Sequence, residues 1–151
     1  MRLVLQRVSE AAVSVVDDLV AAIGPGLLVL AGVATGDDVV DAEVAADKIS
    51  GLRVFADGEG LMNRSILEAG GEVLVVSQFT LLGDARRGRR PSFTEAADPD
   101  LAASVLERLA QRLVDNGVPT LTGRFGAQME VSLVNDGPVT LVLEVREGRV
   151  L

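Results

Sequence analysis

The sequence predicts a single domain of the α+β class, spanning residues 1–151. Its hydrophobic content of 48% is typical of a folded globular protein, and 151 residues are enough to bury one core. Short β-like segments occupy most of the chain, and only two segments have helical periodicity. Because strands and helices do not alternate regularly, the α+β class is favoured over a layered α/β fold.

Strands are expected throughout the first part of the chain. Asp17-Asp18 fits a tight turn between the second and the third strand, and Gly24-Pro25-Gly26 marks the break before the fourth. The fourth is an uninterrupted apolar run, which is typical of a strand that is buried on both faces. These four strands are predicted at residues 2–8, 11–16, 19–23 and 27–33.

Two helices are expected. Either Asp37 or Asp38 can cap the first, which runs to about Ser50. The second spans residues 99–116, and Asp98 precedes it as the N-cap. Apolar residues recur at helical spacing in both, so each helix has one apolar face. The other β-like segments are residues 52–56, 72–76, 119–122, 129–134 and 139–146.

The chain has no histidine and no cysteine. This absence excludes Ser-His and Cys-His nucleophile systems, disulfide bonds and any ordinary zinc site, and we expect neither a metal nor another cofactor. Arginine stays protonated and cannot serve as an ordinary base. A catalytic base must therefore be an Asp, a Glu, the single lysine Lys48, the substrate or water.

No segment is expected to enter a membrane. The apolar runs are all shorter than the roughly 18 residues that a membrane-spanning helix needs. Gln6, Arg7 and Glu10 interrupt the N-terminal stretch that would have to be apolar in a signal peptide. Together with the lack of cysteine, this indicates a cytoplasmic protein.

The net charge of -8 argues against a protein that coats nucleic acid, and no DNA partner is expected. One basic segment stands apart, because Arg86, Arg87, Arg89 and Arg90 lie within five residues. It is either a solvated turn or a patch that touches only the end of an RNA.

Polar residues follow the buried strand predicted at 72–76. In the segment Ser77-Gln78-Phe79-Thr80, rigid backbone at a strand end can aim side chains into a site. Ser77 or Thr80 could act as a nucleophile if a base lay nearby. Alternatively, the segment is a polar strand end whose hydroxyls bind neighbouring backbone groups.

Two further segments have unusual sequences. Asn135-Asp136-Gly137-Pro138 interrupts two β-like segments and is typical of a hairpin turn, although a glycine also allows backbone to approach a ligand closely. A cis Gly137-Pro138 bond is not expected from sequence alone, because only about 5–6% of X-Pro bonds in folded proteins are cis. In residues 122–129, Gly123 and Gly126 flank Phe125, which is consistent with a tight loop that presents an aromatic ring.

Together these segments resemble the D-aminoacyl-tRNA deacylase family, formerly called D-tyrosyl-tRNA deacylase. Eight motifs occur in the family's order and spacing, from Met1 to about Glu144, which makes coincidence very improbable. They are QRV at 6–8, IGPGLLVLAGV at 23–33, ADKI at 46–49, MNRSI at 62–66, VSQFTL at 76–81, RRGRRPSF at 86–93, TGRFGAQM at 122–129 and LVNDGPVT at 133–140.

The resemblance implies mostly antiparallel β-sheets that form a barrel-like core with two main helices, in a homodimer. In this family a cis Gly-Pro step reaches from one subunit into the active site of the other. Here that step is Gly137-Pro138, which would face Ser77–Thr80 of the partner. Its carbonyls would exclude the side chain of an L-amino acid, whereas a D-amino acid or glycine would fit.

The resemblance also assigns roles to other residues. Gln78 and Phe79 would shape the aminoacyl pocket, and the backbone N–H groups of Phe79 and Thr80 would hold the substrate carbonyl. The remaining assignments are Phe125 and Met129 near the terminal adenosine of the tRNA, and Arg7 as the residue that orients the Gly-Pro loop. The implied reaction is hydrolysis of D-aminoacyl-tRNA, and of glycyl-tRNA mischarged on tRNA-Ala.

The expected attacking group is the 2′-OH of the terminal ribose or a positioned water, and Thr80 is kept as a candidate nucleophile. A non-catalytic dimer that binds an RNA end or a small ligand is a second hypothesis, and a Ser/Thr esterase is a third. The chain departs from the family pattern at Asp17-Asp18, at Leu82-Gly83 and in the tail 145–151. Of these, only Leu82-Gly83 lies beside the expected site.

Overall fold

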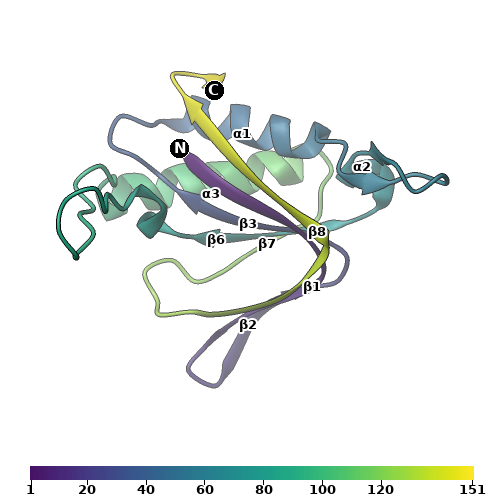
Figure 1. Cartoon of the computed structure of the whole chain (residues 1–151), viewed down its shortest axis with the longest axis horizontal. Coiled ribbons are helices and arrows are strands. Elements are labelled where there is room, and N and C mark those ends of the chain that lie inside the picture. Colours follow the sequence, from purple (N-terminus) through teal and green to yellow (C-terminus); the bar gives the residue numbers. More distant parts are fainter.

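The computed structural model describes all residues 1–151, and a strongly curled mixed sheet forms its centre (Figure 1). The strand order in this sheet is β7-β6-β3-β1-β8-β9, and β2 pairs with β1 beside this path. The β3–β6 and β6–β7 pairs are parallel, and the others are antiparallel. Its strands are β1 (Arg2–Val15), β2 (Asp18–Ile23), β3 (Gly26–Gly32), β6 (Glu72–Ser77), β7 (Thr120–Thr122), β8 (Glu130–Arg146) and β9 (Arg149–Val150).

The two long helices lie side by side on one face of this sheet (Figure 1). Helix α1 (Val39–Gly51) begins at Asp38, whose carboxylate accepts hydrogen bonds from two backbone N–H groups. Helix α3 (Pro99–Asp115) begins at Asp98 and has Pro99 in its first turn. These two main helices and their N-caps were predicted, and the α+β class is confirmed together with the curled, half-barrel sheet.

Two long strands differ from the prediction. The expected strands 2–8 and 11–16 are one continuous strand, β1, which pairs with β8 over most of its length. Likewise, the expected strands 129–134 and 139–146 are one strand, β8, so Asn-Asp-Gly-Pro is not a hairpin turn. In each case one strand of the pair carries extra residues while the ladder resumes beyond them. In a sequence pattern, the residues of such a bulge look like the end of a strand.

Smaller elements were only partly predicted. The expected strand 52–56 is reduced to β4 (Phe55–Ala56), which pairs with β5 (Met62–Arg64) outside the main sheet. The short helix α2 (Ile66–Ala69) was not predicted, although Ser65 and Glu68 form a capping box that identifies its start. The tail folds back as β9 and pairs with the end of β8.

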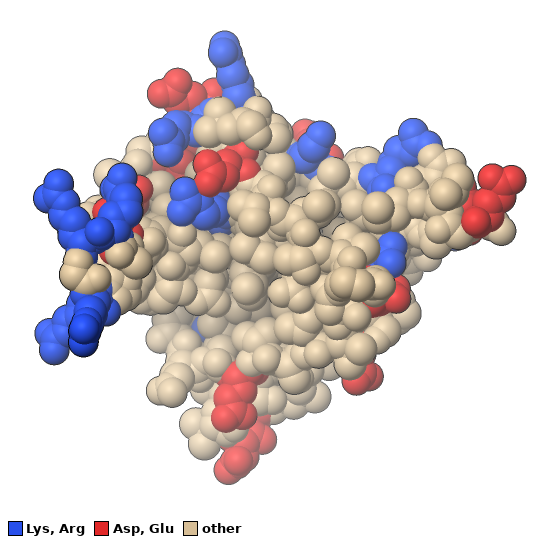
Figure 2. All heavy atoms as spheres, viewed as in Figure 1, with Lys and Arg blue, Asp and Glu red and all other residues tan.

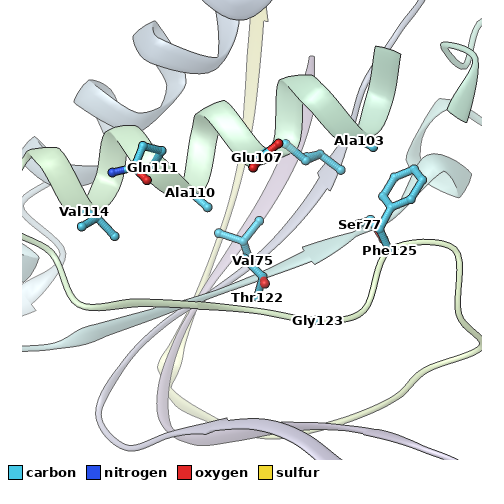
Figure 3. A pocket seen from close by; sticks show the side chains of 11 residues that line it. Val75, Ser77, Ala103, Glu107, Ala110, Gln111, Val114, Thr122, Gly123 and Phe125 are labelled. Atoms are coloured by element: carbon cyan, nitrogen blue, oxygen red, sulfur yellow. The ribbon is translucent and has the colours of Figure 1, made fainter. Parts of the chain in front are cut away.

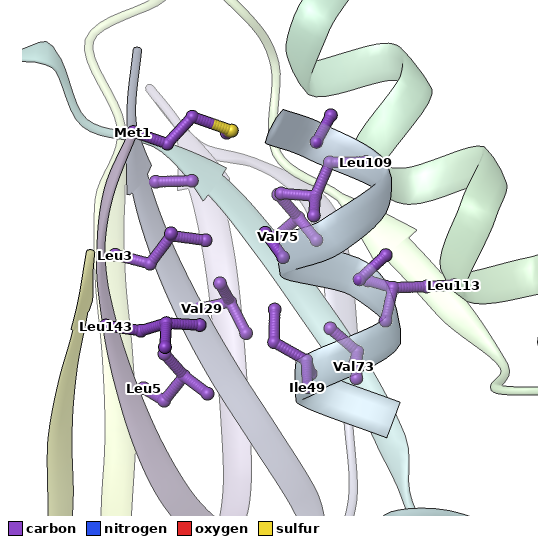
Figure 4. Packing of buried hydrophobic residues seen from close by; sticks show 14 of the residues in the cluster. Met1, Leu3, Leu5, Val29, Ile49, Val73, Val75, Leu109, Leu113 and Leu143 are labelled. Atoms are coloured by element: carbon purple, nitrogen blue, oxygen red, sulfur yellow. The ribbon is translucent and has the colours of Figure 1, made fainter. Parts of the chain in front are cut away.

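The main core lies between the sheet and the two long helices, as Figure 4 shows. Leu109 and Leu113 of α3 are fully buried there against Val73 and Val75 of β6. A smaller cluster fills the other side of the sheet, inside the curl made by β1 and β2. Because β3 and β6 are buried on both faces, they form a rigid base on which the end of β6 is fixed.

Two ion pairs link the long helices at the surface. Arg108 binds Glu43 at 2.7 Å, and Arg112 binds Asp47 with both ends of its guanidinium at 2.8 and 2.9 Å. The hydrogen bond from Arg112 lowers the pKa of the Asp47 carboxyl, helped by one from Asn116. Since these groups are partly exposed, each pair contributes little to stability, and burial of the apolar faces of the helices dominates. The chain contains no helix that is both long and apolar enough to span a membrane.

Candidate functional site

The segment Ser77–Thr80 lies where the central strand β6 ends and leaves the sheet. Ser77 is the last residue of β6, and a single turn of 3₁₀ helix, η1 (Phe79–Leu82), follows. Gln78 has an irregular backbone between them, and its N–H donates to the carbonyl of Ala31 on β3 at 2.8 Å. The fixed strand and this hydrogen bond together determine where the next side chains point.

A cavity of about 470 Å³ opens beside this strand end. Ser77, Gln78 and Phe79 line it, and so do Phe125 and Met129. The rest of the lining is made mainly of small apolar side chains: Ala31, Val33, Val76, Ala96, Ala97, Pro99, Ala102, Leu106, Gly126, Ala127 and Val131. An apolar hollow with a few polar groups at one wall is the usual form of a small-molecule site.

The structure therefore brings together five of the residues that the sequence marked, from segments about 50 positions apart. Phe79 is 58% exposed and Phe125 is 44% exposed, which is unusual for phenylalanine. Two exposed rings at the rim of one cavity offer surfaces for an apolar or aromatic ligand.

Thr80 lies next to this cavity but is not among the residues that line it. Its hydroxyl accepts a hydrogen bond from the side-chain amide of Gln78, and it makes no other side-chain hydrogen bond. No carboxylate or lysine forms a hydrogen bond with the hydroxyl of Ser77 or Thr80, and the amide of Gln78 cannot take up a proton at ordinary pH. The base that a serine or threonine nucleophile needs is therefore absent from hydrogen-bonding distance.

A second, shallower hollow of about 290 Å³ continues from the cavity along α3 (Figure 3). The two share Ser77, Leu106 and Phe125, so Phe125 stands at their junction. Side chains of α3, including Glu107 and Gln111, face Thr122 across this hollow. Sequence analysis did not mark Glu107, the one carboxylate in the two linings, because it looks like any exposed residue of a helix.

Gly83 belongs to Leu82-Gly83, the departure from the family pattern that lies beside the expected site. A Cβ atom at position 83 would lie 2.9 Å from the ring of Phe93 and 3.0 Å from the carbonyl oxygen of Thr80. Without that atom, Phe93 packs edge-on against Phe79, with ring centroids 5.2 Å apart. Gly83 thus leaves room for Phe93 to pack against Phe79, which lines the cavity.

Gly137 and Pro138 lie at the top of a bulge in β8. Between the pairs Gln6–Thr140 and Val8–Asn135, β1 advances by two residues while β8 advances by five. The Gly137-Pro138 peptide is cis, and both residues are exposed. Neither lines the cavity or the hollow of its own chain.

Gly137 cannot be replaced without distortion. Its φ angle is +150°, and a Cβ atom would lie 2.6 Å from the backbone nitrogen of Val139. A side chain at this position would therefore force the bulge to change shape.

Arg7 and Asn135 hold the bulge from both sides. Arg7 lies opposite it on β1, donates to the carbonyl of Asp136 at 2.9 Å and lies 3.4 Å from the carboxylate of the same residue. The Asn135 side chain donates to the carbonyl of Val139 at 3.1 Å and accepts from its N–H at 3.0 Å. The Arg7 contact was expected from the resemblance. Asn135 was missed as a positioning residue, because an Asn before Asp-Gly is also a common turn residue.

Comparison with known proteins gives the site its context. The family model described as D-Tyr-tRNA(Tyr) deacylase matches residues 4–144 of this chain. The chain belongs to this family. A D-aminoacyl-tRNA deacylase of a Roseiflexus species is 57% identical over 144 residues, which cover 95% of this chain and 93% of that protein. Another from Chloroflexus aurantiacus is 54% identical over 149 residues, which cover 99% and 93%.

Solved structures agree with the fold of this deacylase. One, titled c-Myc DNA Unwinding Element Binding Protein, has 36% sequence identity and a TM-score of 0.88, and the match covers 95% of this chain and 98% of that one. A second, a probable eukaryotic D-amino acid tRNA deacylase, has a TM-score of 0.79 over 93% of this chain and 97% of that one. At 21% identity, this second match supports the fold alone. The resemblance expected from the sequence motifs is thus confirmed, and with it the assignment to a family of hydrolases.

Proposed function

We propose that this deacylase hydrolyses the ester bond between a D-amino acid and the 3′ end of tRNA, releasing both. Glycine mischarged on tRNA-Ala would be a second substrate, because it has no side chain to exclude. The proposal rests mainly on one observation: an exposed Gly137-Pro138 bulge and a mostly apolar cavity at Ser77–Phe79 occur in one member of this family. They would form one site across a homodimer.

The cavity would hold the aminoacyl end of the tRNA. In this proposal Phe125 and Met129 pack against the terminal adenosine, since RNA ends are commonly bound by stacking on aromatic rings. Gln78 and Phe79 shape the aminoacyl pocket. The N–H groups of Phe79 and Thr80 belong to the first turn of η1, where N–H groups have no partner within the helix, and they would stabilise the oxyanion.

Discrimination between enantiomers would come from Gly137-Pro138 of the partner subunit. Their backbone would occupy the space that an L side chain needs, and this rejects the wrong substrate by exclusion rather than by tighter binding of the right one. Arg7 and Asn135 would act as positioning residues that fix the bulge.

Strand β8 supplies the surface for the proposed dimer. Val134, Leu141 and Val142 on this strand are 51%, 39% and 66% exposed, and they flank the bulge in sequence. Apart from a short pairing with β9, β8 has β1 on one side only, so its other edge is free. An exposed edge with apolar side chains favours association with another chain.

The attack on the ester would be made by the ribose 2′-OH of the tRNA or by a positioned water. The protein would contribute orientation and stabilisation of charge, which together can account for large rate effects. This division fits a site in which neither Ser77 nor Thr80 has a base. Thr80 is kept as the alternative nucleophile, and the Thr80→Ala variant tests this role.

Deacylation of matched D- and L-tyrosyl-tRNA tests the proposal. Purified protein should release D-tyrosine and leave L-tyrosyl-tRNA intact, and should release glycine from glycyl-tRNA-Ala. Addition of a chelator should not change the rate. Equal rates on the two enantiomers would contradict the exclusion mechanism, and stoichiometric binding without turnover would contradict the enzymatic function.

A further inference from the structure

Four arginines form the tip of one exposed loop. This arginine loop, residues 84–92, begins and ends at two backbone hydrogen bonds between Asp84 and Ser92, of 2.7 and 2.9 Å. All residues from 85 to 92 are exposed. Figure 2 shows basic side chains gathered at the end of the molecule where Figure 1 places this loop.

The four arginines are not equivalent. Arg86 binds Asp84 through two of its nitrogens, both at 2.8 Å, and its backbone N–H donates to the same carboxylate at 2.9 Å. These contacts lower the pKa of Asp84 to about 2, chiefly through the Arg86 side chain, so the pair stays ionised at neutral pH. Arg86 therefore stabilises the base of the loop.

Arg87, Arg89 and Arg90 have no such partner. All three are exposed, and none takes part in an ion pair or a side-chain hydrogen bond within the chain. Three guanidinium groups on a short loop held closed at its base are suited to bind phosphate oxygens.

The loop lies beside the cavity in the chain and in space. It follows directly on η1, and Phe93, just after it, packs on Phe79 in the cavity wall. Ala96 and Ala97 then line the cavity itself. A polynucleotide whose last residue lies in the cavity would thus have its preceding phosphates near this loop.

The charge of the remaining chain favours the same location. The four arginines carry +4, and removing them from the net charge of -8 leaves -12 for the rest of the protein. Phosphates would be repelled by most of this surface, whereas a local basic patch attracts them.

We propose that Arg87, Arg89 and Arg90 bind backbone phosphates of the tRNA acceptor arm while its aminoacyl-adenosine end occupies the cavity. This inference rests on the proposed function, and it adds the arginine loop to the cavity as a second surface that contacts the tRNA. The contact is to phosphates, so it gives affinity and orientation without reading the sequence of the tRNA. Arg86 has a different role, as a positioning residue for the loop.

The test compares two triple variants of the full-length protein. One replaces Arg87, Arg89 and Arg90 by Gln. The matched control replaces three other exposed arginines that lie far from the loop in sequence, namely Arg53, Arg146 and Arg149. Both variants lose the same charge, so a general electrostatic effect would appear equally in both.

Binding of uncharged tRNA is measured by fluorescence anisotropy between 50 and 200 mM NaCl. Loss of three phosphate contacts should weaken binding about 20-fold at low salt, and the difference should shrink as salt rises, because each contact contributes about 0.7–0.9 to the slope of log affinity against log salt. The control variant should keep the wild-type slope. An equal slope in the loop variant and the wild type would overturn the inference.

A second measurement separates this inference from the proposed function. D-Tyrosyl-tRNA and the D-tyrosyl ester of adenosine, which has no phosphate, are hydrolysed in parallel. The loop variant should have a raised KM for the tRNA with an unchanged kcat, and wild-type kinetics on the adenosine ester. Equal losses on both substrates would overturn the inference, since phosphates could not then be responsible.

Two fragments of the tRNA locate the phosphates. A single-stranded CCA oligonucleotide contains only those next to the terminal adenosine, and an acceptor minihelix adds those of the duplex. If the loop variant and the wild type differ only with the minihelix, the contacts lie in the duplex. If hydrolysis fails with every substrate but the salt slopes still differ, the proposed function falls while the phosphate contact is supported.

Discussion

Thr80 has a hydroxyl at the site but no partner that could activate it. Its one side-chain hydrogen bond comes from the amide of Gln78. If the ribose 2′-OH or water attacks, Thr80→Ala removes only this hydrogen bond and leaves the backbone N–H in place. We therefore expect kcat to fall by no more than about 10-fold, which corresponds to about 1.4 kcal/mol in the activation barrier.

The measurement is single-turnover deacylation of D-tyrosyl-tRNA by the variant. Thr80→Ser serves as the control, because it keeps the hydroxyl and changes only the methyl group. A loss of four orders of magnitude in Thr80→Ala, with activity retained in Thr80→Ser, would identify Thr80 as a nucleophile and contradict the substrate-assisted mechanism.

Val16 is the residue with the least favourable backbone. It lies in the two-residue turn between β1 and β2, with a φ angle of +55°, and its side chain is 83% exposed. A β-branched residue is strained in this region and here gains no burial in return. Val16→Gly is expected to raise the free energy of unfolding by about 0.5–1 kcal/mol, after allowing for the greater flexibility of glycine in the unfolded chain.

Urea denaturation of the variant gives this free energy. Asp17→Gly, in the same turn but without a positive φ, is the matched control and should destabilise the protein slightly. A lower stability of Val16→Gly than of wild type would show that the strain is relieved in some other way.

Several residues of the candidate site could be predicted, because the resemblance to the family assigns Ser77, Gln78, Phe79, Phe125 and Met129 to one site, and all five line one cavity. The positioning role of Asn135 could not, since it depends on a hydrogen bond across the bulge to Val139. Glu107 was missed for a similar reason: only the fold brings α3 beside the loop that carries Phe125.

At the scale of elements, the caps of the two long helices differ in strength. Asp38 accepts from the N–H groups of Val40 and Asp41, and the Asp41 carboxylate binds the N–H of Asp38 in return. Asp98 accepts from Leu101 alone. Asp38→Ala should destabilise the protein by about 1–2 kcal/mol, and Asp98→Ala by about 0.5–1 kcal/mol.

Both values come from thermal or urea unfolding monitored by circular dichroism. Asp38→Asn is the control, because Asn is also a good N-cap and should restore most of the stability. If Asp98→Ala were the more destabilising change, the reciprocal capping box would not be the stronger start of a helix in this fold.

The same scale shows why the prediction of strands succeeded only in part. Periodicity located the buried strand β3 and both helices, because their apolar patterns are long and regular. It divided β1 and β8, because a register shift brings polar or turn-forming residues into a strand without ending it. Pairing between residues that are 116 (Ser14 and Glu130) to 142 (Arg2 and Glu144) positions apart keeps these strands continuous, and no local pattern contains that information.

In the whole molecule, the Gly137-Pro138 bulge does not line the cavity of its own chain. If the bulge serves the neighbouring subunit, each subunit has one half of two sites. Dissociation of the dimer should then abolish activity although every chain keeps its cavity. The curled sheet would serve both purposes, since β6 ends at the cavity and β8 carries the bulge on the outside.

Complementation between two inactive variants tests this directly. Gly137→Ala damages the bulge, where a Cβ atom would lie 2.6 Å from the nitrogen of Val139. The double variant Gln78→Ala/Phe79→Ala damages the cavity, and neither of these side chains is buried, so the fold should persist. Each variant alone should be almost inactive on D-tyrosyl-tRNA.

The decisive measurement is the deacylase activity of an equimolar mixture after the subunits have been exchanged. In a symmetric dimer, half of the molecules become mixed dimers, each with one site made of an intact cavity and an intact bulge. The mixture should therefore regain about a quarter of wild-type activity. No recovery, in a mixture shown to contain mixed dimers, would mean that the bulge acts within its own chain and would contradict the cross-subunit site.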